Sequence, residues 1–169
     1  MERNGGNTMV GDMKPTLYLE TTIPSYYTAL PSRDIVVLAH QEITREWWNV
    51  CISQYEIFVS ELVIQEALCG DPDAAKRRTE AISLFPVLEI LPEAERLAGI
   101  YLRKIPILKE ALRDALHLAI ASAHGMDYLV TWNCTHIARG EVRKVLEQIN
   151  DLEGIVTPTI CTPEELTGG

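Results

Sequence analysis

The chain lacks several features that would place it in a specialised class of protein. Its four cysteines are widely scattered, with no Cys-x-x-Cys pair and no histidine spaced to complete a zinc site. No apolar run approaches the roughly 18 residues that a membrane-spanning helix requires. Basic residues are in the minority, because 15 Lys and Arg face 24 Asp and Glu and give a net charge of −9. The sequence therefore argues against a disulfide or zinc scaffold, a membrane span and nonspecific attraction to nucleic acid.

A length of 169 residues fits one domain, which can bury roughly 70% of its unfolded surface. Residues 1–13 contain glycine, asparagine and methionine but no apolar core, so they do not resemble a signal peptide. We expect a flexible leader over residues 1–13 and a single domain over residues 14–169. Cysteines without pairing motifs are typical of reduced thiols, and we expect a cytoplasmic protein.

Segments with the pattern of strands alternate with segments with the pattern of helices. This alternation predicts βαβ units, a central and mainly parallel sheet, and helices on both of its faces, which is a three-layer α/β/α fold. The predicted strands cover residues 16–20, 57–60, 87–91, 128–131 and 155–161. The main predicted helices cover residues 32–53, 61–68, 92–104, 111–124 and 137–149, and a further helix starts at residues 71–72.

Three acidic residues lie where a parallel sheet would bring them into one pocket. Glu20 closes the apolar run at residues 17–19, and Asp114 opens an apolar helix. Glu66 lies in the helix that follows the strand at residues 57–60. Such folds bind ligands in the crevice at the carboxyl ends of their strands, and carboxylates gathered there repel one another unless a proton or a cation intervenes. The pattern predicts a hard divalent cation with oxygen ligands.

Each acid also has an ordinary structural interpretation. Glu66 alone would be a solvated helix residue, because glutamate is rarely buried without a partner. Asp114 would stabilise the N-terminus of its helix. Glu20 is harder to explain in this way, because an acid followed by two threonines is poor strand chemistry. His117, three residues after Asp114, is interpreted as a packing histidine rather than a base.

The ordered set of motifs resembles the PIN-domain family. Residues 17–23, Leu-Tyr-Leu-Glu-Thr-Thr-Ile, are similar to the first strand and first acidic motif of that family, and Glu66 is similar to its second acid. Residues 114–119, Asp-Ala-Leu-His-Leu-Ala, resemble the third acidic motif. Residues 129–133, Leu-Val-Thr-Trp-Asn, resemble the strand with the fourth position. The resemblance covers the chain from about residue 14 to residue 162 and consists of four motifs in the family's order.

The resemblance implies a metal-dependent endoribonuclease of the VapC toxin type. It further implies an RNA substrate, a partner antitoxin protein, homodimerisation, and Mg²⁺ or Mn²⁺ as cofactor. Carried over by resemblance, Glu20, Glu66 and Asp114 would hold the metal, with Asn133 as the fourth catalytic position. Thr22 and Thr131 would orient the ligands through their hydroxyls, and Arg113, Arg139, Arg143 and Lys144 would form part of a basic rim or simply be solvated.

Two positions depart from the family pattern and keep other functions open. The first acid is Glu20, where the family more often has Asp, and the fourth position is Asn133, where many members have Asp. These changes permit a degenerate, noncatalytic module that binds RNA or a protein partner. A haloacid-dehalogenase-type phosphatase would need Asp-x-Asp where the chain has Glu20-Thr21-Thr22, and the residue set of a phospho-acceptor domain is not found.

Overall fold

A computed structural model describes residues 13–167, and five strands form its central sheet. Their spatial order is β3-β2-β1-β4-β5, and every neighbouring pair is parallel. The strands are β1 (Thr16–Leu19), β2 (Glu56–Ser60), β3 (Val87–Leu88), β4 (Tyr128–Val130) and β5 (Thr159–Cys161). The first strand of the chain is thus the central strand of the sheet, and the carboxyl ends of β1, β2 and β4 share one edge.

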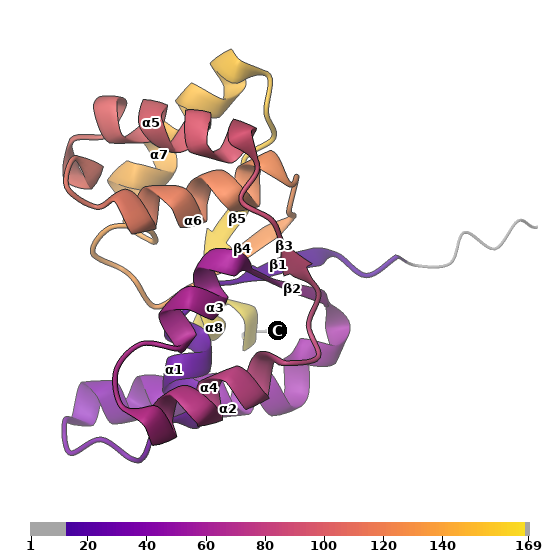
Figure 1. The fold of residues 1–169 in the computed structure, drawn as a ribbon, viewed down its shortest axis with the longest axis vertical. Helices are drawn as coiled ribbons and strands as arrows, with labels where there is room; N and C mark the ends of the chain where they lie inside the picture. Colours follow the sequence, from indigo (N-terminus) through magenta and orange to yellow (C-terminus); the bar gives the residue numbers. More distant parts are fainter. Residues whose placement is uncertain (1–12, 168–169) are drawn as a thin grey trace, which may run out of the picture.

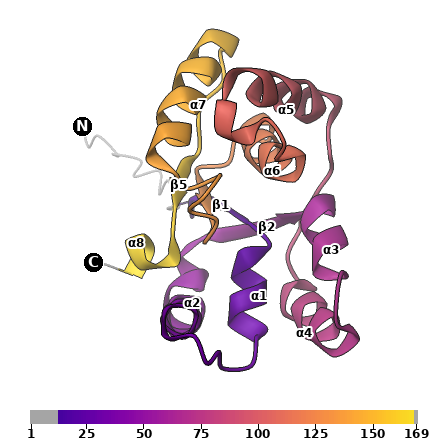
Figure 2. The ribbon, with the colours of Figure 1, turned by 90° about the vertical axis from the view of Figure 1, so that its left-hand side faces the viewer.

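Helices lie on both faces of the sheet, as Figures 1 and 2 show. One face is covered by α5 (Pro92–Lys104), α6 (Leu112–Ala123) and α7 (Gly140–Glu153), and the other by α1 (Thr22–Thr28) and α2 (Ile35–Cys51). Beside α1 lies α4 (Pro72–Ile82), which is preceded by α3 (Glu61–Ala67), and α8 (Pro163–Thr167) packs on α2. Short 3₁₀ turns follow α2 at Ile52–Gln54 and α5 at Pro106–Leu108. The predicted α/β fold with a parallel sheet is confirmed.

Capping side chains begin several of these helices. Asp34 accepts hydrogen bonds from the first backbone amides of α2, and Asp71 accepts one from Ala74 at the start of α4. The side chain of Ser60 accepts a hydrogen bond from the amide of Val63, so β2 passes directly into α3. At its other end α7 stops at Gly154, whose φ of 71° favours glycine.

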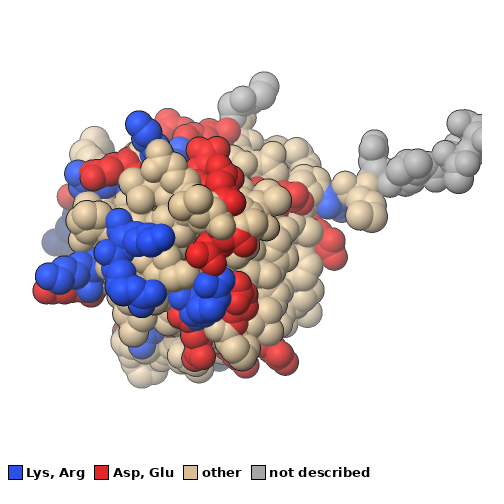
Figure 3. Space-filling model, turned by 90° about the horizontal axis from the view of Figure 1, so that it is seen from above, with Lys and Arg blue, Asp and Glu red and all other residues tan. Residues whose placement is uncertain are grey.

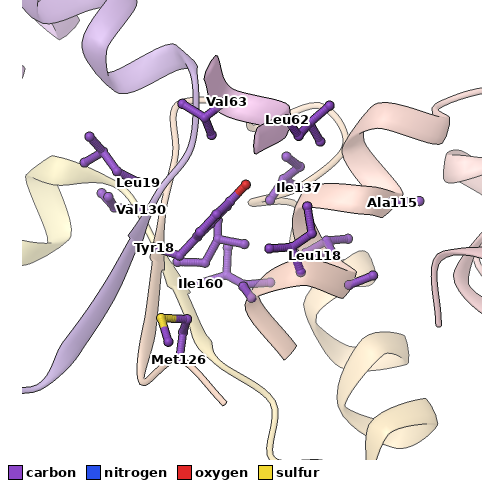
Figure 4. Close-up of a cluster of buried hydrophobic side chains, with 14 of the residues drawn as sticks. Tyr18, Leu19, Leu62, Val63, Ala115, Leu118, Met126, Val130, Ile137 and Ile160 are labelled. Carbon is purple, nitrogen blue, oxygen red and sulfur yellow. The ribbon is translucent and has the colours of Figure 1, made fainter. Parts of the chain in front are cut away.

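The core lies between the sheet and its helices, and the central strand is completely enclosed. Leu17, Tyr18 and Leu19 are all 0% exposed. Burial on both faces explains why this strand is a continuous apolar run rather than an alternating one. Figure 4 shows part of the core around Tyr18, where side chains from the sheet, α3 and α6 meet.

The first and fourth predicted strands each lose one residue at the C-terminal end, and two other predicted strands are three or more residues shorter in the structure. Strand β3 ends at Leu88 because the next backbone groups bond to side chains: the carbonyl of Glu89 lies 2.9 Å from Nε2 of His124, and the amide of Ile90 donates to Glu61. The last strand covers residues 159–161 rather than 155–161, since Pro158 has no amide hydrogen to donate to a neighbouring strand.

The predicted helix over residues 137–149 is instead α7, which covers residues 140–153. The amides of Ile137 and Ala138 both donate to the carbonyl of Asn133, which makes a turn before the helix. The predicted leader over residues 1–13 lies outside the described residues, except for Met13. Within residues 13–167, none of the helices has the length and apolar character needed to cross a membrane.

Candidate functional site

The carboxyl edge of the sheet brings together residues that are far apart in the sequence. Glu20 follows β1 directly, and its amide donates to the carbonyl of Val130 at the end of β4 at 3.1 Å. Thr131 comes directly after that strand, while β2 passes into α3, which carries Glu66. The positions predicted from the sequence at strand ends therefore do lie at one edge.

Glu20 is buried and held by threonine hydroxyls. Its side chain is 5% exposed, and its Oε2 accepts hydrogen bonds from three donors. These are the Thr22 amide at 3.1 Å, the Thr22 hydroxyl at 2.5 Å and the Thr131 hydroxyl at 2.7 Å. All three donors approach the same oxygen, which leaves Oε1 for another partner. The structure thus places both Thr22 and Thr131 on Glu20, where they fix its orientation.

Glu66 points into the same space from α3. Its Oε2 accepts a hydrogen bond from the Thr21 hydroxyl at 2.5 Å and lies 2.9 Å from Nε2 of His117, while Arg113 Nη1 lies 3.3 Å from Oε1. Burial by itself raises the pKa of this carboxyl, but contacts with His117, Thr21 and Arg113 outweigh burial and lower the pKa from 4.5 to about 2. Glu66 is therefore ionised at neutral pH.

The imidazole of His117 completes a compact group. Its side chain is 1% exposed, and Nε2 faces both carboxylates, at 2.9 Å from Glu66 and 3.9 Å from Glu20 Oε1. Ligand atoms of Glu20, Glu66 and His117 all lie within 4.8 Å of one another. Two carboxylate oxygens and one ring nitrogen at this separation fit a divalent cation by their chemistry.

Asp114 makes different contacts. Its Oδ1 accepts a hydrogen bond from the Asn133 side-chain amide at 3.0 Å, and its Oδ2 lies 2.7 Å from Nδ1 of His136. The side-chain oxygen Oδ1 of Asn133 in turn accepts from the backbone amide of His136 at 3.0 Å. The backbone amide of Asn133 donates to the Thr131 hydroxyl at 2.9 Å, and that hydroxyl donates to Glu20. The group formed by Asp114, Asn133 and His136 therefore adjoins the group around Glu20. The role of Asp114 as a metal ligand stays a prediction.

Thr21 and His136 were not expected in the site from the sequence, and Arg113 and His117 make contacts there other than those expected. Thr21 and Arg113 hold Glu66, His117 lies between the two glutamates, and His136 holds Asp114. The only signal for His117 was its position one helical turn after Asp114, and for His136 its position three residues after Asn133. Neither spacing reveals the partner across the fold.

The expected basic rim is only partly available. Arg113 contacts the site, whereas Arg139 lies 3.7 Å from Glu141 and Arg143 lies 3.4 Å from Glu165. On the face drawn in Figure 3, basic side chains gather on one part of the surface and acidic side chains lie beside them. Local contacts at the site, rather than overall charge, would have to attract a polyanion.

Comparisons with known proteins show the family and the fold. The family described as "PIN domain" matches residues 35–133, more than half of the chain, and the match includes Glu66, Asp114 and Asn133. No curated protein matches. Among solved structures, VapBC2 from Rickettsia felis, bound to a DNA fragment from its promoter, has a TM-score of 0.52 and 13% identity and covers 87% of this chain and 98% of that one.

A second structure shows the same fold at similarly low identity. Mycobacterium tuberculosis VapC20, described as a sarcin-ricin loop cleaving toxin, has a TM-score of 0.52 and 16% identity. It covers 68% of this chain and 87% of that chain. At these identities the two structures support the fold alone.

Proposed function

The chain belongs to the PIN-domain family, and on that premise we propose that it is a metal-dependent endoribonuclease that hydrolyses RNA phosphodiester bonds. The observation that carries the proposal is the convergence of Glu20 and Glu66 at the carboxyl edge of the sheet, with ligand atoms within 4.8 Å. Members of the family are typically metal-dependent nucleases. The proposed cofactor is Mg²⁺ or Mn²⁺.

Glu20 and Glu66 would hold the ion, and Asp114 would be the third acid, directly or through water. When bound, a divalent ion lowers the pKa of water and offsets the charge that develops on the phosphoryl oxygens during hydrolysis. The hydroxyls of Thr22 and Thr131 keep Glu20 in one orientation, and Thr21 does the same for Glu66. Such outer hydrogen bonds fix the direction of the ligand lone pairs.

The adjoining group would act on the RNA itself. Asp114 holds Nδ1 of His136, so Nε2 is the ring nitrogen left to contact the scissile phosphate. Side-chain exposure is 35% for His136 and 59% for Arg113, so both are accessible to a polynucleotide. Once a cation balances Glu66, the guanidinium of Arg113 is available for a phosphate oxygen. These two side chains supply the local contacts that a chain with a net charge of −9 needs.

The biological role that fits this chemistry is the toxin of a toxin-antitoxin pair. The likeness to VapC20 and to VapBC2 supports this role, because the first is described as a sarcin-ricin loop cleaving toxin and the second as bound to a DNA fragment from its promoter. An antitoxin protein and a second copy of the chain are the proposed protein partners.

RNA cleavage with matched variants tests the proposal. Tag-free protein would be incubated with total RNA and sequenced fragments would be mapped, in Mn²⁺, in Mg²⁺ and in excess chelator. We expect metal-dependent cleavage that falls by roughly 100-fold or more in Glu66→Gln and in Asp114→Asn. Glu95→Gln, which changes an exposed acid on α5 away from the site, is the control and should retain activity. Circular dichroism would establish that each variant is folded.

Two results would count against the proposed nuclease activity. Undiminished cleavage by folded Asp114→Asn would contradict the site assignment. A wild-type protein that binds the ion but cleaves no RNA would instead favour the noncatalytic binding module that Glu20 and Asn133 permit.

A further inference from the structure

A buried chain of hydrogen bonds ends at the candidate metal site. Nδ1 of His117 lies 2.7 Å from the hydroxyl of Tyr18, and that hydroxyl lies 2.8 Å from Oγ of Ser60. The amide of Val63 donates to Ser60 at 3.2 Å. Tyr18 and Ser60 are 0% exposed and His117 is 1% exposed. Figure 4 shows the Tyr18 hydroxyl oxygen among apolar side chains, so these polar groups depend on one another for their hydrogen bonds.

The direction of the hydrogen bonds follows from counting donors. Because the Val63 amide already donates to Ser60, the Ser60 hydroxyl is free to donate to Tyr18. Tyr18 then donates to Nδ1 of His117, and Nε2 carries the ring hydrogen and donates to Glu66. Every donor in this direction has an acceptor.

The same series of hydrogen bonds also suits the other neutral form of the imidazole, in which the ring hydrogen is on Nδ1. If Nε2 faces a cation, the ring hydrogen resides on Nδ1 and is donated to Tyr18, whose hydroxyl turns towards Ser60. The change relocates the ring hydrogen from Nε2 to Nδ1 and rotates the hydroxyl hydrogens of Tyr18 and Ser60, while the heavy atoms of these three side chains keep their places. A metal-binding histidine almost always donates its second ring N–H to a fixed acceptor, and Tyr18 provides that acceptor here.

We infer that His117 is a direct nitrogen ligand of the ion held by Glu20 and Glu66, and that the site therefore selects a transition-metal ion such as Mn²⁺ over Mg²⁺. This inference rests on the metal site in the proposed function. Mg²⁺ prefers an octahedron of oxygen ligands and retains several waters, whereas imidazole nitrogen favours transition-metal ions. Nε2 is already directed at both carboxylates, at 2.9 Å and 3.9 Å, so it would be part of any coordination sphere between them. Tyr18 and Ser60 act as positioning residues.

Pulsed electron paramagnetic resonance of Mn²⁺ tests the inference without any assay of activity. Tag-free protein would be loaded with one equivalent of Mn²⁺, and the echo modulation would reveal a ¹⁴N nucleus bonded to the ion. Uniform ¹⁵N-histidine labelling of the wild type should convert the ¹⁴N pattern to a ¹⁵N pattern. His136→Gln is the matched control, because this side chain is the other imidazole near the acids and is partly exposed. We expect the nitrogen signal to persist in His136→Gln.

Variants of His117 and Tyr18, which belong to the buried series of hydrogen bonds, give a second, independent measurement. His117→Gln should remove the nitrogen signal and reduce the ratio of Mn²⁺ to Mg²⁺ affinity by roughly 10-fold or more, because it replaces the ring nitrogen by an amide. Tyr18→Phe should keep the nitrogen signal but weaken Mn²⁺ binding by about 10-fold. Competition calorimetry would measure both affinities. If His117→Gln does not fold, the labelled wild type and His136→Gln still decide the question.

The outcomes separate this inference from the proposed function. Mn²⁺ binding that depends on Glu66 but shows no nitrogen coupling would overturn the role of His117 and leave the nuclease proposal intact. A nitrogen signal that disappears in His136→Gln would assign the nitrogen ligand to His136 and would also overturn the inference. If the protein binds no Mn²⁺ at all, the inference and the metal site of the proposed function fail together.

Discussion

Replacing Thr131 by valine tests how the site is held together. The side chain is 0% exposed, and its hydroxyl donates to Glu20 at 2.7 Å and accepts from the Asn133 amide at 2.9 Å. Losing a hydrogen bond to a carboxylate costs about 1.5–3 kcal/mol, and the unpaired amide adds about 1 kcal/mol. The buried methyl group that replaces the hydroxyl stabilises the folded protein by about 0.8 kcal/mol. We therefore expect Thr131→Val to lower the free energy of unfolding by about 2–3 kcal/mol.

Thr131→Ser is the matched control, because it keeps the hydroxyl and removes only the methyl group. Its expected cost is about 1 kcal/mol, from lost burial and a small cavity. Urea unfolding followed by tryptophan fluorescence would measure both variants, and the slope with denaturant should be unchanged. Thr131→Val should also bind Mn²⁺ more weakly, because Glu20 loses one of its orienting donors. The reasoning would be refuted if the valine variant were as stable as the serine variant.

Three further predictions concern pH, the far end of the fold and the substrate. The folded pKa of Glu66 is about 2, below the usual 4.5, so its stabilising contribution is complete above pH 4.5 and is lost as pH falls towards 2. Because the side chain is partly exposed, solvent screening reduces this contribution to the free energy of unfolding to about 1–2 kcal/mol. Metal-free Glu66→Gln should therefore show a smaller loss of stability between pH 4.5 and pH 2 than the metal-free wild type. Asn150, which is 0% exposed, binds Tyr101, Ser122 and Thr157. In thermal unfolding Asn150→Ala should cost about 2–4 kcal/mol, and a cost below 1 kcal/mol would mean that water replaces these bonds. His136→Ala should lower RNA cleavage by roughly 100-fold in steady-state kinetics with Mn²⁺ affinity unchanged, and equal losses of both would place His136 in the metal site instead.

The architecture was predictable because its signals are local. Buried parallel strands are continuous apolar runs, and three of the helices (α2, α3 and α4) begin with a capping side chain, so the order of elements follows from the sequence. The exceptions have long-range causes. Glu89 and Ile90 leave the strand pattern because His124 and Glu61 bind their backbone groups, and those partners lie 29 or more residues away.

The site was predictable where a residue is fixed by the end of a strand, as with Glu20 and its threonines. It was less predictable where the outcome depends on side-chain contacts between elements. His117 shares α6 with Asp114, but only the fold places its ring between Tyr18 and Glu66. Likewise the turn made by Asn133 brings His136 to Asp114, and no periodicity in the sequence encodes that pairing.

The most direct test of the account is a crystal structure with Mn²⁺ and an anomalous difference map, beside a crystal grown in chelator. The account predicts one strong peak between Glu20 and Glu66 at the carboxyl edge of the sheet, and no peak there in the chelator crystal. A map without density between these two carboxylates, at a Mn²⁺ concentration that saturates other protein sites, would contradict a metal-dependent nuclease.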